Sequence, residues 1–311
     1  MGRRRKGRNI SGIVLLDKPL GITSNRALQI VKRFYNAAKA GHTGSLDPLA
    51  TGLLPLCLGE ATKVSGFLLD ADKVYLATLK LGIKTFSADA EGEVIETRAV
   101  ENYTEKQINA AIEPFLGDIE QTPPMHSALK VDGQPLYKLA HQGIVIERKS
   151  RPVHIFAIDV LRHEGDEIDI EVHCSKGTYI RTLAEDIGEN LGCGAHLIAL
   201  RRTESGPFHL EESITLDELE QLAENVKEEG FDELDSILMP AEEALHDWDD
   251  VDLSEDAAFY ICRGQAVQVP NAPTEGLVRL FSEKDGFLGI GEIMDDGRVQ
   301  PTRLFVIHDK D

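Results

Sequence analysis

The 311-residue chain is poor in aromatic residues and in cysteine. Aromatic residues make up 6% of it, and its four cysteines, at positions 57, 174, 193 and 262, include no Cys-x-x-Cys pair. Without such pairs neither a zinc site nor a disulfide framework is expected, and scattered single cysteines are typical of a reducing compartment. We expect them to be small core residues.

Long hydrophobic runs and nucleotide-binding glycine motifs are also absent. No apolar stretch approaches the roughly 18 residues of a membrane span, and the basic N-terminus lacks the apolar region of a signal peptide. The sequence contains no P-loop pattern GxxxxGK[ST], no dinucleotide fingerprint and no ligands at metal-binding spacing. We therefore predict a cytoplasmic protein with no membrane span and no metal site.

Basic residues are few, and the excess of acids is local. The chain has 33 Lys and Arg against 53 Asp and Glu, a net charge of −20, which is unusual for a protein that binds nucleic acid. Residues 211–256 hold 19 acids and one base, and subtracting their −18 from −20 leaves −2 for the rest. Residues 1–70 hold 11 bases and four acids, a net +7. The N-terminal part can therefore attract RNA, whereas the acidic stretch is interpreted as a solvated helical surface.

Hydrophobic periodicity predicts both strands and helices, and the chain length favours two domains, at 1–250 and 251–311. In the first we expect strands at 12–16, 53–58, 74–81, 155–161, 168–174 and 197–202. Helices are expected at about 24–34, capped by Ser24, and at 61–69, 104–115, 184–191 and 216–226. This mixture predicts an α+β fold on a mixed or antiparallel sheet. Residues 240–250 are interpreted as a linker, and residues 253–305 as one short helix with several short strands.

One loop concentrates unusual residues. The run GHTGSLDPLATG, residues 41–52, holds three glycines and one proline, and Asp47 is its only acid. Glycines let the backbone approach a ligand closely, and Pro48 disfavours the helical region for the residue before it. The carboxylate is therefore expected on stiff, non-helical backbone. An isolated Asp-Pro pair would indicate only a turn, but the density of special residues here favours a functional loop.

This loop, with GEATK at 59–63 behind it, closely resembles the signature of the TruB family, the bacterial tRNA pseudouridine synthases that isomerise uridine 55 in the T loop. SKGTYIRTL at 175–183 and LRRT at 200–203 match two further family segments. The resemblance implies that Asp47 is catalytic, that Arg181 pairs with it and that Tyr179 faces the target base. An arginine beside Asp47 would lower the pKa of its carboxyl group and keep it ionised.

The resemblance also implies how the base is bound. Tyr75 would stack on the flipped uracil, and Leu200 would line the uracil pocket with Tyr179. Lys18 belongs to an Asp-Lys-Pro-x-Gly segment, which the family carries beside its active site. We hypothesise that His42 fills the stack that the base vacates.

The implied reaction breaks the bond from C1′ to N1 of uridine and joins C1′ to C5, so nothing is oxidised and no cofactor is expected. The sequence leaves open whether Asp47 attacks C1′, attacks C6 or takes a sugar proton. The implied partner is the T stem-loop of tRNA, bound by a monomer without a protein partner.

Three RNA-binding elements are implied by the resemblance: a basic arm at 1–10, an RNA-gripping loop at about 123–152 and a PUA-like β-barrel at 251–311. Three residues depart from the family pattern, because Phe86, His126 and His141 stand where an acid, a tyrosine and an arginine are more usual. In the same pattern Asp89 is kept, but we assign it no chemistry. Two alternatives remain open, a guide-RNA-dependent pseudouridine synthase and a non-catalytic tRNA-binding chaperone.

Overall fold

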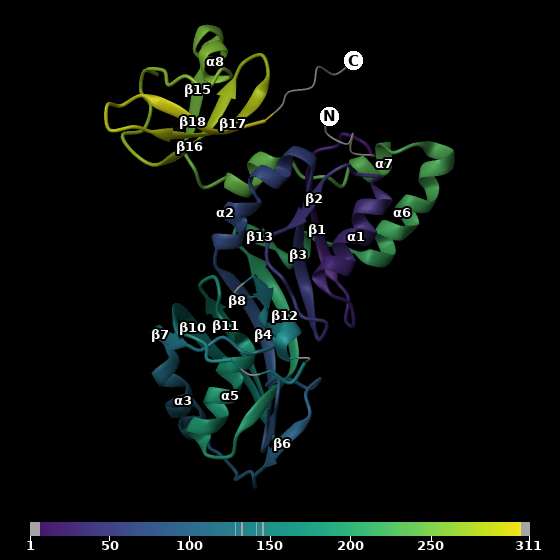
Figure 1. The fold of residues 1–311 in the computed structure, drawn as a ribbon, viewed down its shortest axis with the longest axis vertical. Helices are drawn as coiled ribbons and strands as arrows, with labels where there is room; N and C mark the ends of the chain where they lie inside the picture. The colour runs from purple at the N-terminus through teal and green to yellow at the C-terminus, as the bar shows by residue number, and fades with distance from the viewer. Residues whose placement is uncertain (1–6, 128, 132, 141, 145, 306–311) are drawn as a thin grey trace.

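A long mixed β-sheet forms the centre of the molecule (Figure 1). The computed structural model describes residues 7–127, 129–131, 133–140, 142–144 and 146–305. Within these ranges the sheet has ten strands in the order β14-β1-β3-β12-β4-β11-β10-β7, with β2 paired to β3 and β13 to β12. Its pairs are antiparallel except β1 with β14 and β3 with β12. The predicted α+β fold is confirmed.

In the described ranges the sheet contains the six predicted strands, most of them a few residues longer than expected, and four strands that were not predicted. The ten strands are β1 (Gly12–Lys18), β2 (Ala40–His42), β3 (Ala50–Leu58), β4 (Lys73–Leu81), β7 (Gly117–Gln121), β10 (Arg151–Glu164), β11 (Glu167–Cys174), β12 (Ala195–Ser205), β13 (Phe208–His209) and β14 (Ile214–Thr215). Two small hairpins lie outside it, β5 (Ile83–Thr85) with β6 (Val94–Thr97) and β8 (Lys130–Val131) with β9 (Gln134–Pro135).

Two groups of helices pack on the sheet around separate hydrophobic clusters. α1 (Ser24–Phe34) and α6 (Leu216–Glu229) pack with β1 and β3 in the first cluster. α3 (Glu105–Ile112) and α5 (Ile180–Leu191) pack with β4 and β11 in the second. Tyr75 and Leu200 pack against both clusters. They therefore mark the line where the two halves of the sheet meet.

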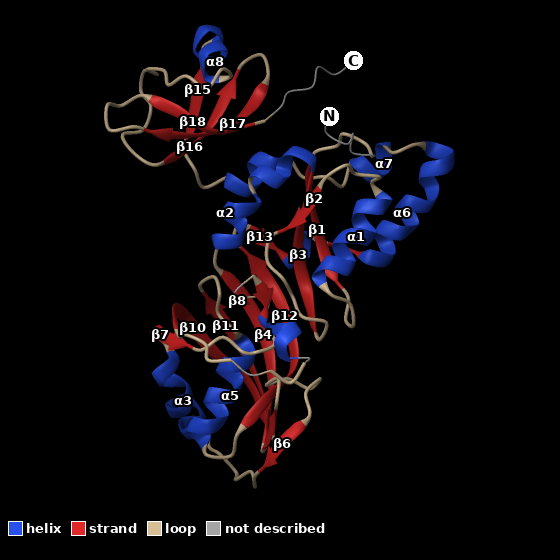
Figure 2. Cartoon of the chain, viewed as in Figure 1, coloured by secondary structure: helices blue, strands red, loops and turns tan. Residues whose placement is uncertain are grey.

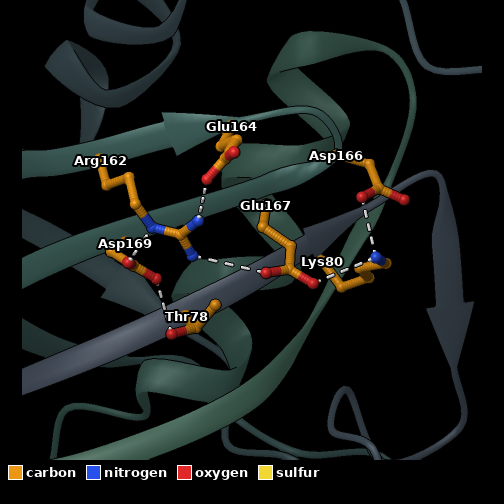
Figure 3. A network of polar contacts seen from close by, with 7 residues as sticks. All are labelled: Thr78, Lys80, Arg162, Glu164, Asp166, Glu167 and Asp169. Atoms are coloured by element: carbon orange, nitrogen blue, oxygen red, sulfur yellow. Dashed lines mark hydrogen bonds and ion pairs between the residues drawn. The ribbon is translucent and has the colours of Figure 1, made fainter.

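The opposite face of β4, β10 and β11 carries a network of ion pairs (Figure 3). Ile168, Ile170 and Val172 of β11 point into the second cluster, so the residues between them face the other way. There Arg162 contacts Asp169 at 2.6 Å and Glu164 at 2.9 Å, and Lys80 contacts Asp166 at 2.8 Å. We call these residues, with Thr78 and Glu167, the outer network.

Two predicted helix boundaries were wrong. Thr23, not Ser24, caps α1, because the Thr23 hydroxyl accepts from the backbone of Arg26 while Ser24 bonds to Leu46 instead. The helix expected at 61–69 is divided into a 3₁₀ helix, η1 (Gly59–Lys63), and α2 (Ser65–Asp70). Thr104 and Gln107 form a capping box at the start of α3, and the 3₁₀ helix η2 (Glu113–Phe115) follows α3.

The segment 240–250 is not a free linker, contrary to our prediction. It contains the 3₁₀ helix η4 (Ala241–Leu245), whose alanines and leucine are buried in a third cluster with Ile13 and Leu53. The Trp248 ring meets Phe67 edge to face at 4.9 Å between ring centroids. Apolar side chains between the acids anchor this segment to the sheet, so composition alone was misleading. The preceding acidic stretch contains η3 (Leu210–Glu212), α6 and α7 (Asp232–Asp235).

The C-terminal part forms a smaller sheet at one end of the molecule (Figure 2). Its strands are β15 (Asp250–Leu253), β16 (Leu277–Ser282), β17 (Gly286–Ile293) and β18 (Val299–Leu304), in that order, with α8 (Glu255–Ile261) above them. A hairpin turn at Asp296-Gly297 connects β17 to β18. This domain is consistent with a PUA-like fold. Lys63 of η1 reaches it, donating to the Leu304 carbonyl at 2.6 Å.

The structure describes residues 7–10 of the expected basic arm and most of the expected RNA-gripping loop at 123–152. Arg8 of the basic arm is tied to the acidic stretch, because it pairs with Asp235 and lies 3.6 Å from the Phe231 ring centroid. The loop at 123–152 contains β8, β9 and α4 (Leu136–Ala140) and has its own small apolar cluster around Met125. His141 lies outside the described residues. Within the described part of the chain, no helix is long and apolar enough to cross a membrane.

Candidate active site

The loop that carries Asp47 is fixed from several sides. It connects β2 to β3, and the Ser24 hydroxyl bonds both to the Leu46 amide, at 2.7 Å, and to the Leu46 carbonyl, at 3.0 Å. Gly52 has φ +97°, and a Cβ there would lie 2.3 Å from the carbonyl oxygen of Arg202. Only glycine fits at such a position. The expectation of stiff, non-helical backbone around Asp47 is confirmed, since Asp47 lies outside every helix.

Arg181 connects Asp47 to a second carboxylate. It lies in the first turn of α5, and its Nη2 is 3.0 Å from Asp47 Oδ2, as the resemblance implied. Its Nη1 is 3.1 Å from Asp89 Oδ2 and donates to the Ser87 carbonyl, and Nη2 also donates to the His126 carbonyl at 2.7 Å. The side chains of Arg181 and Asp89 are 7% and 4% exposed, whereas that of Asp47 is 45% exposed. Asp47 is thus the member of this trio that faces the open side.

Asp89 is a site residue that the sequence analysis missed. It is buried, and its Oδ1 accepts from the Ser87 hydroxyl at 2.6 Å and from the Glu91 amide at 3.0 Å. Gly92 closes the same turn, where a Cβ would lie 2.3 Å from the Ser87 hydroxyl. The available signal was the retention of Asp89 and Gly92 in a loop that otherwise departs from the family pattern.

Arg181 lowers the pKa of Asp47 as predicted, but the net shift of that pKa is in the opposite direction. Burial of the carboxyl group raises its pKa above the ordinary value, Arg181 lowers it, and Asp89 raises it again. Lys18 and His126 also lower it, but the net change is upward. The prediction counted only the arginine, because neither the burial nor the second carboxylate is visible in the spacing of the residues.

The residues implied in base binding surround this trio. Tyr75 on β4 and Leu200 on β12 lie on the line between the two clusters, and Leu200 is paired in register with Ala50, three residues after Asp47. Burial raises the pKa of Tyr75, and the positive charge of Arg202 opposes this. His42 is half-buried, and burial and then Arg202 lower its pKa.

Tyr179 occupies the N-cap position of α5, two residues before Arg181. Its backbone is held by Gln121 at the end of β7, which accepts from the Tyr179 amide at 2.9 Å and donates to its carbonyl at 3.3 Å. Burial raises the pKa of the Tyr179 hydroxyl, and the nearby Ser127 side chain lowers it. The start of the loop at 123–152 is joined to the start of α5 by the hydrogen bond from Arg181 to the His126 carbonyl.

Lys18 does not face an open surface. It is completely buried, and its Nζ donates to the carbonyls of Ile22 at 2.7 Å and Pro19 at 2.9 Å. Burial lowers its pKa to about 8, although Asp47 and Glu91 act in the opposite direction. Lys18 thus supports the turn before α1.

Two departures from the family pattern meet beside the trio. The rings of Phe86 and His126 pack edge to face at 5.6 Å between centroids, and the carbonyl of His126 is the one that holds Arg181. No group of three or more His, Cys, Asp or Glu side chains arranged to hold a metal ion occurs in the described ranges.

The fold and the site together indicate the class of enzyme to which the chain belongs. An ionisable aspartate on a rigid loop, paired with a buried arginine between two halves of a mixed sheet, is the arrangement expected of a pseudouridine synthase. A crystal structure of a Cbf5-Nop10-Gar1 complex has a chain that superposes on this one with a TM-score of 0.75 and 31% identity, covering 96% of this chain and 86% of that one.

Family models narrow the class. Residues 32–180 match the TruB family pseudouridylate synthase N-terminal domain, residues 181–246 the tRNA pseudouridylate synthase B C-terminal domain, and residues 250–305 the pseudouridine synthase II TruB C-terminal model. The tRNA pseudouridine synthase B of Nitrosococcus oceani is 55% identical over 97% of both chains. That of Shewanella sp. strain MR-4 is 52% identical over 100% of this chain and 99% of its own. The chain belongs to the TruB family.

Proposed function

We propose that this TruB family enzyme converts uridine 55 in the T loop of tRNA to pseudouridine. The observation that carries the proposal is the exposure of Asp47 at 45%, next to an arginine and a second carboxylate that are almost completely buried. A substrate that enters from the open side meets Asp47 first. The relatives at 52% and 55% identity, which are named tRNA pseudouridine synthase B, support tRNA as the substrate.

The reaction needs no group from outside the RNA. The bond from C1′ to N1 breaks, the uracil turns within the site, and C1′ joins C5; one proton leaves C5 and one is taken up by N1, so atoms and charge balance. Asp47 supplies the ionised carboxylate for this rearrangement, and Arg181 holds it in place at 3.0 Å. A fixed charge of this kind needs no reorganisation at the moment of reaction.

The target base must first leave its stack, which costs a few kcal/mol. In the proposal Tyr75 stacks on the flipped uracil, a contact worth about 1 to 3 kcal/mol. Leu200 and Tyr179 bound the pocket, and His42 occupies the vacated stack. Lys18 acts indirectly, through the turn that its Nζ holds.

The remaining parts are assigned to RNA binding. We divide the chain into a catalytic domain at 1–250 and an RNA-binding domain at 251–311, with the loop at 123–152 gripping the T stem-loop. The link from Gln121 to Tyr179 would pass closure of that loop to the active site. The enzyme would act as a monomer, in the cytoplasm, where its tRNA substrate is found.

A guide-RNA-dependent enzyme is the alternative with a specific observation in its favour, the 31% identity to the chain of the Cbf5-Nop10-Gar1 complex. The 55% identity to a tRNA pseudouridine synthase B outweighs it. A tRNA-binding chaperone without chemistry would not require Asp47, so one variant separates that alternative.

The test is site-specific detection of pseudouridine in unmodified tRNA transcript incubated with the purified chain alone. We expect conversion at uridine 55 without guide RNA, and loss of at least about 10³-fold in rate for Asp47→Asn with tRNA binding unchanged within a few-fold. Conversion only after a guide RNA is added would establish the alternative enzyme. An Asp47→Asn protein with the normal rate would exclude the proposed chemistry.

A further inference from the structure

Arg202 is only 1% exposed, and it is the largest by volume of the almost completely buried side chains among the described residues. It lies on β12, where the register pairs it with Gly52 of β3 on one side and with Tyr75 of β4 on the other. Residues paired across strands in this way share a face of the sheet. Arg202 thus lies between the loop that carries Asp47 and the strand that carries the stacking tyrosine.

The guanidinium of Arg202 holds backbone on the loop side. Its Nε donates to the Leu53 carbonyl at 2.7 Å, and its Nη2 lies 3.4 Å from the Gly44 carbonyl, three residues before Asp47. On the other side it is paired in register with Tyr75 of β4, and its positive charge lowers the pKa of the Tyr75 hydroxyl against the effect of burial. A Cβ on Gly44 would come within 3.3 Å of Nη1, so the loop packs directly on the planar group.

No carboxylate pairs with Arg202 among the described residues. Its neighbour Arg201 points the other way and pairs with Asp17, with Nη2 and Oδ2 at 2.7 Å. A buried charge without a counter-charge is costly, and an apolar side chain of similar length would avoid that cost. We therefore expect the charge of Arg202, or the N–H donors of its guanidinium group, to have a function at this position.

We propose that Arg202 is a positioning residue of the active site, which fixes the Asp47 loop at Gly44 relative to Tyr75 on β4. This inference rests on the proposed function for its effect on turnover, but not for its geometry. The same cation discourages protonation of His42, the residue assigned to the vacated stack, so that a neutral ring is available to stack. After burial, the positive charge of Arg202 is what lowers the pKa of that imidazole.

The first test is structural and needs no RNA. Proteins labelled with ¹³C at His Cε1 and Tyr Cζ are titrated by NMR as wild type, Arg202→Met and Arg202→Lys, with Arg162→Met as the control for loss of an exposed arginine. We expect the pKa of His42 to rise in Arg202→Met, because the cation that lowers it is removed, and to stay near the wild-type value in Arg202→Lys. The Tyr75 resonance should move in both Arg202 variants. Wild-type His42 and Tyr75 signals in Arg202→Met would overturn the proposal.

The second test separates positioning from binding. Because Arg202 does not reach the surface, Arg202→Met should lower kcat by about 100-fold with the Kd for tRNA within threefold. Arg202→Lys keeps the charge but cannot span both carbonyls, and it should lose about tenfold in kcat. If Arg202→Met does not fold, the lysine variant alone decides: a wild-type kcat for it would refute the positioning role. If the wild-type protein makes no pseudouridine while the NMR shifts appear, the proposed function fails and the positioning role stands.

Discussion

Two regions of the molecule combine one arginine with several carboxylates, and they differ in burial. In the outer network Arg162 contacts three acids, and its side chain is 43% exposed. At the active site Arg181 contacts two acids and is 7% exposed. Water screens the first set, so its pairs contribute little, whereas the second set interacts in a medium that magnifies each charge. Pairs of arginine with carboxylates thus support the strand register in the outer network, whereas at the active site they hold the reactive aspartate.

The largest difference between the two regions should appear when the arginine of each, Arg181 or Arg162, is replaced. Arg181→Met leaves Asp47 and Asp89 without the cation that pairs with both of them, and losing one partner of a buried pair costs about 3 to 5 kcal/mol. We expect this loss in urea unfolding, together with a fall of at least about 10³-fold in single-turnover pseudouridine formation. An Arg181→Met protein as stable and active as Arg162→Met would remove the distinction between the two regions.

Asp89→Asn tests the second carboxylate of the buried set. Asp89 raises the pKa of Asp47, so its neutralisation should lower that pKa and move the acid limb of the kcat profile to lower pH. The plateau rate should also fall, by about 10- to 100-fold, because Arg181 loses one of its anchors. The measurement is kcat against pH from 5 to 8. A limb that stays in place or moves to higher pH would contradict this account.

Two lysines on β4 sharpen the comparison through opposite pH effects. Lys73 is buried, donates to the carbonyls of Leu68 and Leu69, and has its pKa lowered to about 8. The unfolded chain then binds more protons between about pH 8 and 10.5, so Lys73 makes stability rise with pH in that window. Lys80, whose pKa is raised by hydrogen bonds to Asp166 and Glu167, contributes stability that is lost above pH 10.5.

Urea unfolding of Lys73→Met and Lys80→Met from pH 7.5 to 10.5 measures this difference. The free energy of unfolding of wild type relative to Lys73→Met should increase over the window by on the order of 1 to 3 kcal/mol. Relative to Lys80→Met it should stay level up to pH 10. Parallel curves for the two variants would show that burial does not distinguish these lysines.

The smallest effect is expected in the outer network itself. Arg162→Met should change the free energy of unfolding only slightly, because exposed ion pairs are screened and their side chains lose entropy on pairing. Raising the salt concentration should reduce even this change, and pseudouridine formation should be unchanged. A loss as large as that of Arg181→Met would mean that the outer network has a role beyond the strand register.

Sequence patterns predicted β1, β3, β4 and β11 because these strands are buried on one or both faces. Burial on both faces gives a continuous apolar run, as in β1 and β3, and burial on one face gives alternating apolar residues, as in β11. Sequence patterns predicted the pair of Asp47 with Arg181 through the resemblance. They could not predict the direction of the Asp47 pKa or the role of Asp89, since both depend on which side chains share a buried volume. The misplaced cap at Ser24 has the same origin, because its hydroxyl is used by a residue 22 positions away.

The two pairings of β12 have a mechanical consequence. This strand is parallel to β3 and antiparallel to β4, so its eleven residues join the half of the sheet that carries Asp47 to the half that carries Arg181. A slip by one residue would turn Leu200 and Arg202 to the opposite face and exchange them with their neighbours. The register of β12 therefore sets the position of the Asp47 loop relative to β4. Insertions in the loops at either end of β12 can be absorbed, whereas a single insertion within the strand would separate the aspartate from its pocket.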